Sequence, residues 1–311
     1  MSLRLAIVTA IARHLVKPRL RRTATPAAAR REFELAAQFF FPRPAHLCRR
    51  VRRNGPLRLD WVSARPLPPG RLVLYFHGGA YVAGSPATHQ GLLGWLSEGT
   101  GCEVCAPRYR LAPEAPFPAA FEDACAAWTR LETLGYAPGD IVLGGDSAGG
   151  GLALALMAWL CARGSPPAGL FAFSPWTDLA GTGASLTANA RKDALLPAER
   201  LPEVAQYALA GQDPRDPRIS PLYASFAAPP PPVLLQVART EILFDDAARM
   251  AQILHDAGGS ATLDVLPDAP HVVQLMGPRV PEAGAAVARA ARFARACLDA
   301  AQAGSGVIAS R

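Results

Sequence analysis

The amino-acid sequence predicts an α/β fold in which a mostly parallel central sheet carries helices on both faces and a helical cap. Strand-like and helix-like segments alternate over residues 72–301, and the strands are almost continuously apolar, as in Leu72–Phe76. A Gly-x-Ser-x-Gly motif at 145–149 joins one such strand to a helix. The 311 residues suffice for a large core, and no apolar run reaches the ~18 residues that a membrane-spanning helix needs.

Two segments interrupt this alternation and divide the predicted domain. Residues 1–44 are expected to form N-terminal cap helices, and residues 178–225, with their Gly and Asp-Pro pairs, a second cap insert. Residues 45–177 and 226–303 are expected to be the two parts of the main α/β domain, and 304–311 a flexible tail. Because ligands enter at the carboxyl edge of a parallel sheet, the two cap segments can pack together there as a lid.

The N-terminal cap is expected to contain two helices. Apolar residues at helical spacing from Leu3 to Leu15 indicate the first, which Pro18 is expected to end. The segment Ala27–Phe41 indicates the second, with Thr25 as its N-cap and Pro26 in its first turn.

The sheet is expected to begin with an antiparallel hairpin at one edge and to continue with parallel strands. In the hairpin, strands Cys48–Arg53 and Leu57–Ser63 flank a turn at Asn54–Gly55. The other strands are expected at Leu72–Phe76, Glu103–Pro107, Asp140–Leu143, Leu170–Phe173, Val233–Val237 and Thr262–Leu266. The helices between and after them are expected at His89–Glu98, Pro118–Leu134, Leu152–Arg163, Ala198–Ala210, Asp245–Ala257 and Pro281–Ala301.

The basic residues are concentrated at the N-terminal end of the chain. The formal net charge is +7, but residues 1–53 contain thirteen Lys and Arg against two acids, and the remainder carries −4. Such a segment could contact nucleic acid or anionic lipid. We favour the simpler interpretation of arginines on the outer faces of amphipathic helices, and we expect no nucleic-acid partner and no stable membrane insertion.

The six cysteines, at irregular spacing, indicate neither a disulfide framework nor a metal site. Cys102 and Cys105 form a single CxxC, but in a strand their odd separation directs the thiols to opposite faces. Reduced, buried thiols are typical of a cytoplasmic protein, which is the expected location. No motif indicates a cofactor or a metal ion. The Arg-rich residues 1–31 are interpreted as a retained helix rather than a targeting peptide.

The strand–turn–helix segment around Ser147 indicates a nucleophile. An apolar strand runs into Gly145, and a helix follows the turn. Gly145 and Gly149 are required because a Cβ at either position would collide with the neighbouring strand or helix. The helix N-terminus behind Ser147 supplies free N–H groups and a positive dipole end. We therefore predict that Ser147 is a nucleophile rather than part of a structural turn.

Backbone N–H groups near this serine are candidates for an oxyanion hole. His77, Gly78 and Gly79 follow a buried strand, and the two glycines leave their N–H groups uncovered. Preorganised donors stabilise the negative charge that develops on a carbonyl oxygen during acyl transfer, by roughly 3 kcal/mol each. We assign the N–H groups of Gly78, Gly79 and Ala148 to this role and expect His77 to hold the loop by hydrogen bonds.

A base and an acid are also needed, because a serine hydroxyl is a weak nucleophile until a neighbour removes its proton. Of the six histidines, His271 follows the last strand at the edge where Ser147 emerges, so His271 is the predicted base. The chain order nucleophile, acid, base places the acid after the strand Val233–Val237. Glu241 lies in that loop and is the predicted acid, with Asp245 as the alternative.

Together these motifs resemble the hormone-sensitive-lipase-like (HSL, bacterial family IV) esterases of the α/β-hydrolase superfamily. The resemblance covers about Arg71 to His271 and includes further blocks at Tyr109–Glu114, Pro116–Pro118, Ser174–Asp178, Asp213–Pro217 and Ser220–Tyr223. It implies an α/β-hydrolase fold and the same serine, histidine and oxyanion donors. Two positions depart from the family pattern: Ala80 stands where a third glycine is common, and Glu241-Ile-Leu where Asp-Pro-Leu is common.

The resemblance implies a cofactor-independent serine carboxylesterase that hydrolyses short- to medium-chain acyl esters through an acyl-enzyme. The same chemistry could act on an amide, a lactone or a peptide. A non-catalytic small-molecule receptor on this fold would have lost the base, whereas His271 is present. The expected partner is a small-molecule ester, and the sequence allows a homodimer. Aromatic cap residues are expected either to line the acyl pocket or to pack in the core: Phe33, Phe39, Phe40, Phe41 and Tyr207.

Overall fold

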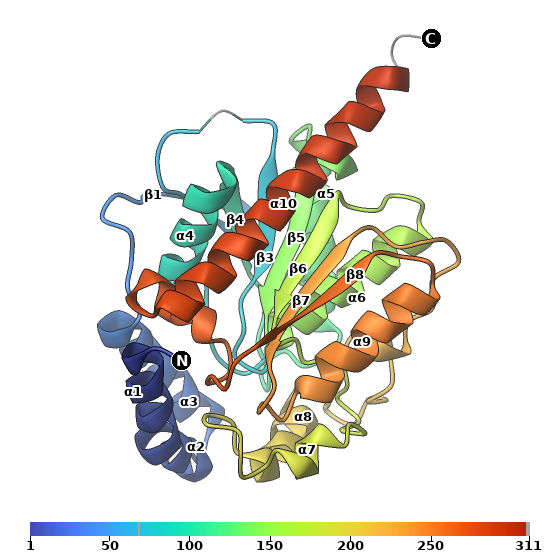
Figure 1. Ribbon diagram of the computed structural model, residues 1–311. Coiled ribbons are helices and arrows are strands. Elements are labelled where there is room, and N and C mark those ends of the chain that lie inside the picture. The colour runs from blue at the N-terminus through green and yellow to red at the C-terminus, as the bar shows by residue number, and fades with distance from the viewer. Residues whose placement is uncertain (68, 309–311) are drawn as a thin grey trace.

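The computed structural model, which describes residues 1–67 and 69–308, has the predicted α/β architecture (Figure 1). The strands follow the order β1-β2-β4-β3-β5-β6-β7-β8 in one sheet. Strands β3 to β8 are parallel, and the hairpin β1–β2 pairs antiparallel with β4 at one edge, as predicted. The strand bounds are β1 Cys48–Asn54, β2 Leu57–Ser63, β3 Leu72–Phe76, β4 Glu103–Arg108, β5 Ile141–Asp146, β6 Gly169–Phe173, β7 Val233–Ala238 and β8 Ala261–Leu266.

Helices cover both faces of the sheet, which explains why its central strands are apolar throughout. Leu74 and Phe76 of β3 pack in the core beneath α5, α6 and α9, whereas Val73 and Tyr75 pack in the core beneath α4 and α10. Among residues 1–67 and 69–308, no helix is long and apolar enough to cross a membrane. The α-helix bounds are α1 Leu3–Ile11, α2 Lys17–Arg22, α3 Pro26–Phe40, α4 Gln90–Thr100, α5 Ala119–Thr133, α6 Ala148–Ala162, α7 Ser185–Ala188, α8 Leu201–Leu209, α9 Phe244–Asp256 and α10 Pro281–Ile308.

The first helix does not end at Pro18, contrary to the prediction. A wide π-type turn at Ala12–Val16 follows α1, and its last hydrogen bond runs from Lys17 N–H to Ala12 O. Pro18 therefore falls in the first turn of α2, where a missing N–H is tolerated, and helical structure continues to Arg22. The second helix begins as predicted, because the Thr25 hydroxyl caps it.

Several predicted boundaries also shift, including the three that follow. Asn54 belongs to β1 and pairs with Leu57, so the hairpin turn is one residue later than predicted. The helix behind Ser147 begins at Ala148, because the glycines that follow the serine are already helical. The predicted tail 304–311 is wrong in its first part, since α10 continues to Ile308, and 309–311 lie outside the described residues.

The N-terminal helices contact the segment 178–225. The Lys17 side chain is buried, and its Nζ donates hydrogen bonds to the carbonyl oxygens of Ala190 (2.9 Å) and Asp193 (2.7 Å). The Arg200 guanidinium donates to the carbonyl oxygens of Arg21 and Thr23, each at 2.8 Å. In Figure 1, α1–α3 lie at the lower left and α7 and α8 at the bottom of the molecule.

Candidate active site

Ser147 occupies a strained turn between β5 and α6. Its backbone has φ 53° and ψ −125°, a left-handed conformation that costs energy for a residue with a Cβ. A Cβ on Gly145 would lie 2.4 Å from the carbonyl oxygen of Gly149, and a Cβ on Gly149 would lie 2.2 Å from that of Phe76. The predicted requirement for both glycines is therefore confirmed, and the turn presents the partly exposed serine at the carboxyl end of β5.

Glu241 and His271 form a buried acid–base pair. Glu241 follows β7 and His271 follows β8, and His271 Nδ1 lies 2.6 Å from Glu241 Oε2. The other carboxylate oxygen, Oε1, accepts hydrogen bonds from Ala238 N–H (2.7 Å) and the Ser174 hydroxyl (2.8 Å). Burial disfavours the imidazolium, but the negative charge of Glu241 and its hydrogen bond prevail, so the pKa of His271 is raised.

Asp245, the alternative acid, has a different partner. It lies in the first turn of α9, and its Oδ2 accepts a hydrogen bond from the backbone N–H of Ser185 at 2.8 Å. The Ser185 hydroxyl in turn donates to Ile242 O. Asp245 therefore anchors the segment around α7, and the structure pairs His271 with Glu241.

Ser147 is connected to the acid–base pair through the ends of adjacent strands. Its N–H donates to Phe173 O at 2.8 Å, and the next residue, Ser174, reaches Glu241 with its hydroxyl. Within the described chain, no hydrogen bond joins Ser147 Oγ to His271 Nε2, so the contact between the predicted nucleophile and the predicted base stays a prediction. The sequence analysis missed Ser174; its only signal was the Ser-Pro-Trp block.

The structure corrects the predicted role of Gly78. Its N–H donates to Asp146 Oδ1 at 3.0 Å and is therefore not free to bind an oxyanion. The loop continues with Gly79 at φ 120° and Ala80 at φ 55°, and within the described chain their N–H groups have no acceptor. The Ala148 N–H, at the start of α6, is likewise an unpaired helix N-terminal donor.

Asp146 holds this loop in place and was also missed from the sequence. In addition to Gly78, its carboxylate contacts the Tyr75 hydroxyl (2.9 Å) and His89 Nε2 (3.2 Å). Burial would raise the pKa of Asp146, but the charge of His89 and the hydrogen bonds from His89 and Tyr75 outweigh burial, so that the pKa is lowered. The ionised carboxylate next to Ser147 thus fixes the loop that follows β3.

His77 is not a candidate base. Burial, together with the nearby His89, lowers its pKa to about 3, so the ring is neutral. Its Nδ1 donates to the carbonyl oxygen of Gly78 at 2.8 Å, and its ring stacks on Tyr109 with 4.2 Å between centroids. His77 thus makes a loop hydrogen bond of the kind that the sequence analysis expected.

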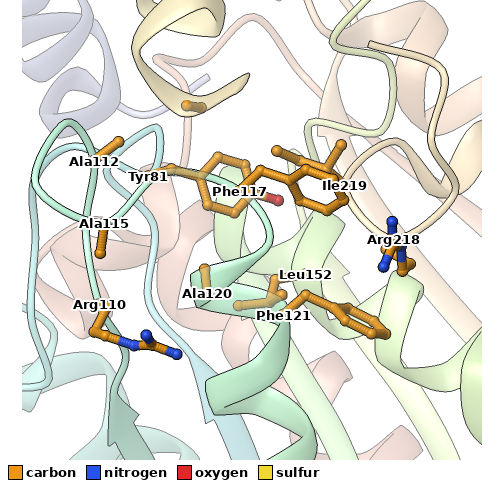
Figure 2. A pocket seen from close by; sticks show the side chains of 11 residues that line it. Tyr81, Arg110, Ala112, Ala115, Phe117, Ala120, Phe121, Leu152, Arg218 and Ile219 are labelled. Atoms are coloured by element: carbon orange, nitrogen blue, oxygen red, sulfur yellow. The ribbon is translucent and has the colours of Figure 1, made fainter. Parts of the chain in front are cut away.

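A cavity of about 10 Å³ lies beside Tyr81, but neither Ser147 nor His271 lines it. Figure 2 shows Tyr81, Phe117 and Ile219 around one side of the cavity. This volume matches about one water molecule, so it does not hold an ester. The Tyr81 hydroxyl is buried without a hydrogen-bond partner among the described residues.

The aromatic cap residues do not share one environment. Phe33 packs edge-on against His89, with 5.6 Å between ring centroids. Phe39 and Phe40 are 70% and 65% exposed, so the expectation that they line a pocket or the core is wrong.

In the part of the chain that the structure describes, no group of three or more His, Cys, Asp or Glu side chains could hold a metal ion.

Comparison with known proteins identifies the class and then the family. Residues 73–275 match a family model described as the alpha/beta hydrolase fold. The chain is 42% identical to an acetyl-hydrolase of Streptomyces hygroscopicus, covering 78% of this chain and 80% of that protein. It is 36% identical to an ethyl acetate hydrolase of Pseudomonas putida, covering 70% of each chain.

A crystal structure of an esterase from the bacterial hormone-sensitive lipase (HSL) family is similar over nearly its entire length. The TM-score is 0.89 at 37% sequence identity, and the match covers 96% of this chain and 99% of that one. The chain therefore belongs to the hormone-sensitive-lipase-like esterases of the α/β-hydrolase family.

Proposed function

We propose that the protein is a serine carboxylesterase that hydrolyses short- to medium-chain acyl esters through an acyl-enzyme intermediate. The 2.6 Å contact between His271 Nδ1 and Glu241 Oε2, at the sheet edge that presents Ser147, carries this proposal. The names of the relatives, an acetyl-hydrolase and an ethyl acetate hydrolase, support small acyl groups.

In the proposed mechanism, Nε2 of His271 takes the proton of Ser147 Oγ while Oγ attacks the ester carbonyl carbon. Glu241 holds the imidazole with its proton on Nδ1 and stabilises the imidazolium that forms. The imidazolium then protonates the leaving alcohol as the C–O bond breaks. A water molecule, deprotonated by His271, hydrolyses the resulting acyl-enzyme and regenerates the serine.

The oxyanion of the tetrahedral intermediates would be bound by three backbone N–H groups. We propose Gly79, Ala80 and Ala148 as the donors, because the Gly78 N–H is already bonded to Asp146. Ala80 retains a backbone N–H in place of the third glycine of the family pattern, so this departure preserves the donor.

We also propose that residues 1–44 and 178–225 form the cap over this edge of the sheet. The hydrogen bonds of Lys17 and Arg200 connect the two segments. The Arg30 side chain of α3 reaches across to the carbonyl oxygens of Val82 (2.7 Å) and Ala112 (2.8 Å), beside the oxyanion loop. The homodimer stays a prediction, which light scattering on the purified chain would test.

The function is tested by measuring p-nitrophenyl butyrate hydrolysis by the wild type and by Ser147→Ala. We expect kcat to fall by about 10⁴-fold or more, because the substitution removes Oγ, the proposed nucleophile. Covalent labelling by a fluorophosphonate should be lost in the same variant. Equal rates for the two proteins would refute the assignment, and faster hydrolysis of butyryl p-nitroanilide than of the ester would replace esters by amides as the substrate.

A further inference from the structure

The exposed large apolar side chains lie in the N-terminal segment, as far as side-chain exposure is described. Every such side chain within residues 1–67 and 69–303 belongs to residues 1–51: Met1, Leu3, Ile7, Ile11, Leu15, Val16, Leu35, Phe39, Phe40 and Val51. Scattered single apolar residues on a surface need no explanation, but a concentrated patch indicates an interaction surface.

The first helix is apolar on two opposite faces. Leu5 and Ala12 face the body of the protein and are buried. Apolar residues recur every four positions on the outer side and are 77%, 50%, 46% and 66% exposed, respectively: Leu3, Ile7, Ile11 and Leu15. A helix that is hydrophobic all round is normally covered on both sides. The outer side of this helix therefore lacks its cover.

The outer side of α3 extends this surface. Helices α2 and α3 are joined where Glu32 contacts both Thr23 and Arg19. At the other end, the Arg279 guanidinium donates to Phe40 O, and Arg279 O accepts a hydrogen bond from Arg4 of α1. The two helical segments therefore run antiparallel (Figure 1), and we call their exposed apolar residues together the cap face: Leu3, Ile7, Ile11, Leu15, Leu35, Phe39 and Phe40.

Basic side chains accompany the cap face. Arg19 follows Leu15 by the same step of four residues, is 68% exposed and forms an ion pair with Glu32. Residues 1–53 contain thirteen Lys and Arg but only two acidic residues. Three exposed arginines of residues 1–44 form neither an ion pair nor a side-chain hydrogen bond within the described chain: Arg22, Arg31 and Arg43. Two copies of this surface would repel each other, whereas a surface of negative charge would be attracted.

We propose that the cap face docks on the surface of an anionic phospholipid bilayer. The apolar side chains would enter the boundary between headgroups and acyl chains, and the arginines would bind lipid phosphates. Docking of this kind is peripheral and needs no spanning helix. On its inner side, α3 contacts the oxyanion loop region through Arg30 and packs Phe33 on His89. Docking would therefore bring the edge that presents Ser147 close to the phase into which apolar esters partition.

Sedimentation with vesicles tests the proposal. The wild type should sediment with vesicles of phosphatidylcholine and phosphatidylglycerol and much less with phosphatidylcholine alone. Ile7→Gln/Ile11→Gln/Leu15→Gln should weaken sedimentation by about tenfold or more. Arg22→Gln/Arg31→Gln should weaken it by about fivefold per arginine. Because these side chains are exposed, hydrolysis of soluble p-nitrophenyl butyrate should be unchanged, which shows that each variant is folded.

Matched variants separate the cap face from general effects. Val51→Gln removes an exposed apolar side chain from β1, and Arg292→Gln/Arg295→Gln removes two exposed arginines from α10; both should sediment like the wild type. Absence of vesicle binding, or equal binding by all variants, would overturn the proposal. A wild-type dimer in light scattering that Ile7→Gln/Ile11→Gln/Leu15→Gln converts to a monomer, without vesicle binding, would assign the cap face to a second copy of the chain.

Discussion

Replacing Glu241 by glutamine tests whether His271 needs a carboxylate rather than any acceptor. Glu241 Oε1 accepts from Ala238 N–H and the Ser174 hydroxyl, and Oε2 faces His271 Nδ1. In the amide only the oxygen can accept, and the immobile Ala238 N–H will retain it, so the NH₂ group will face Nδ1. The imidazole must then carry its proton on Nε2 and cannot accept that of Ser147. We expect kcat to fall about 10⁴-fold, which corresponds to ~5.4 kcal/mol in activation free energy.

Initial rates of p-nitrophenyl butyrate hydrolysis over a pH series measure this effect. Although burial opposes it, the charge of Glu241 raises the pKa of His271, so wild-type kcat/KM should rise with pH through a midpoint above 6.5, where the base loses its proton. Asp245→Asn is the matched control, because Asp245 contacts Ser185 instead, and it should keep wild-type activity. A Glu241→Gln rate within tenfold of the wild type, or an equal loss in Asp245→Asn, would refute the reasoning.

Three further substitutions test the turn around Ser147, the loop that follows β3 and the buried Asp246. Gly149→Ala places a Cβ 2.2 Å from the carbonyl oxygen of Phe76. Thermal melts should show that it lowers the free energy of unfolding by about 3 kcal/mol or more. Gly139→Ala is the control, because a Cβ there would lie 3.4 Å from its nearest neighbour and should not lower the free energy of unfolding. Asp146→Ala releases the Gly78 N–H and should lower kcat about 10- to 100-fold with little change in KM; a change in KM alone would contradict this role. Burial raises the pKa of Asp246 from 3.8 to about 7, so the folded protein retains a proton that the unfolded chain releases, and stability should fall as pH rises through this window. Urea unfolding of Asp246→Asn should lack that slope, and an unchanged slope would refute it.

The parts of the site that follow from chain order could be predicted from the sequence. Parallel strands end at the same edge of a sheet, so residues placed just after strands, such as Ser147, Glu241 and His271, were expected to converge. The same argument gave the strand segments and the hairpin edge, because burial on both faces leaves a continuous apolar run. The spacing of Gly145 and Gly149 identified the tight turn around Ser147, because the backbone packs so closely there that neither position has room for a Cβ.

The remaining features depend on contacts between distant segments. Nothing local to Gly78 shows that its N–H is bonded to Asp146, 68 residues later, instead of facing a substrate. The π-type turn that carries the helix past Pro18 has no recognised sequence signal. Periodicity also could not show that Phe39 and Phe40 point away from the body, because an apolar stripe has the same spacing whether it faces a core or solvent.

The edge strand β1 limits how the folded protein can associate. A terminal strand offers unpaired N–H and C=O groups to any other strand, which is a common start of aggregation. Four arginines lie on this strand, two on each of its sides: Arg49, Arg50, Arg52 and Arg53. Arg49 and Arg50 form ion pairs with Asp60 and Glu103, whereas Arg52 and Arg53 are exposed and form no ion pair within the described chain. A second β1 brought alongside would meet the like charges of Arg52 and Arg53. Charge repulsion therefore opposes the pairing of a second strand with β1. Because salt screens this repulsion, the protein should resist polymerisation through β1 most strongly at low ionic strength.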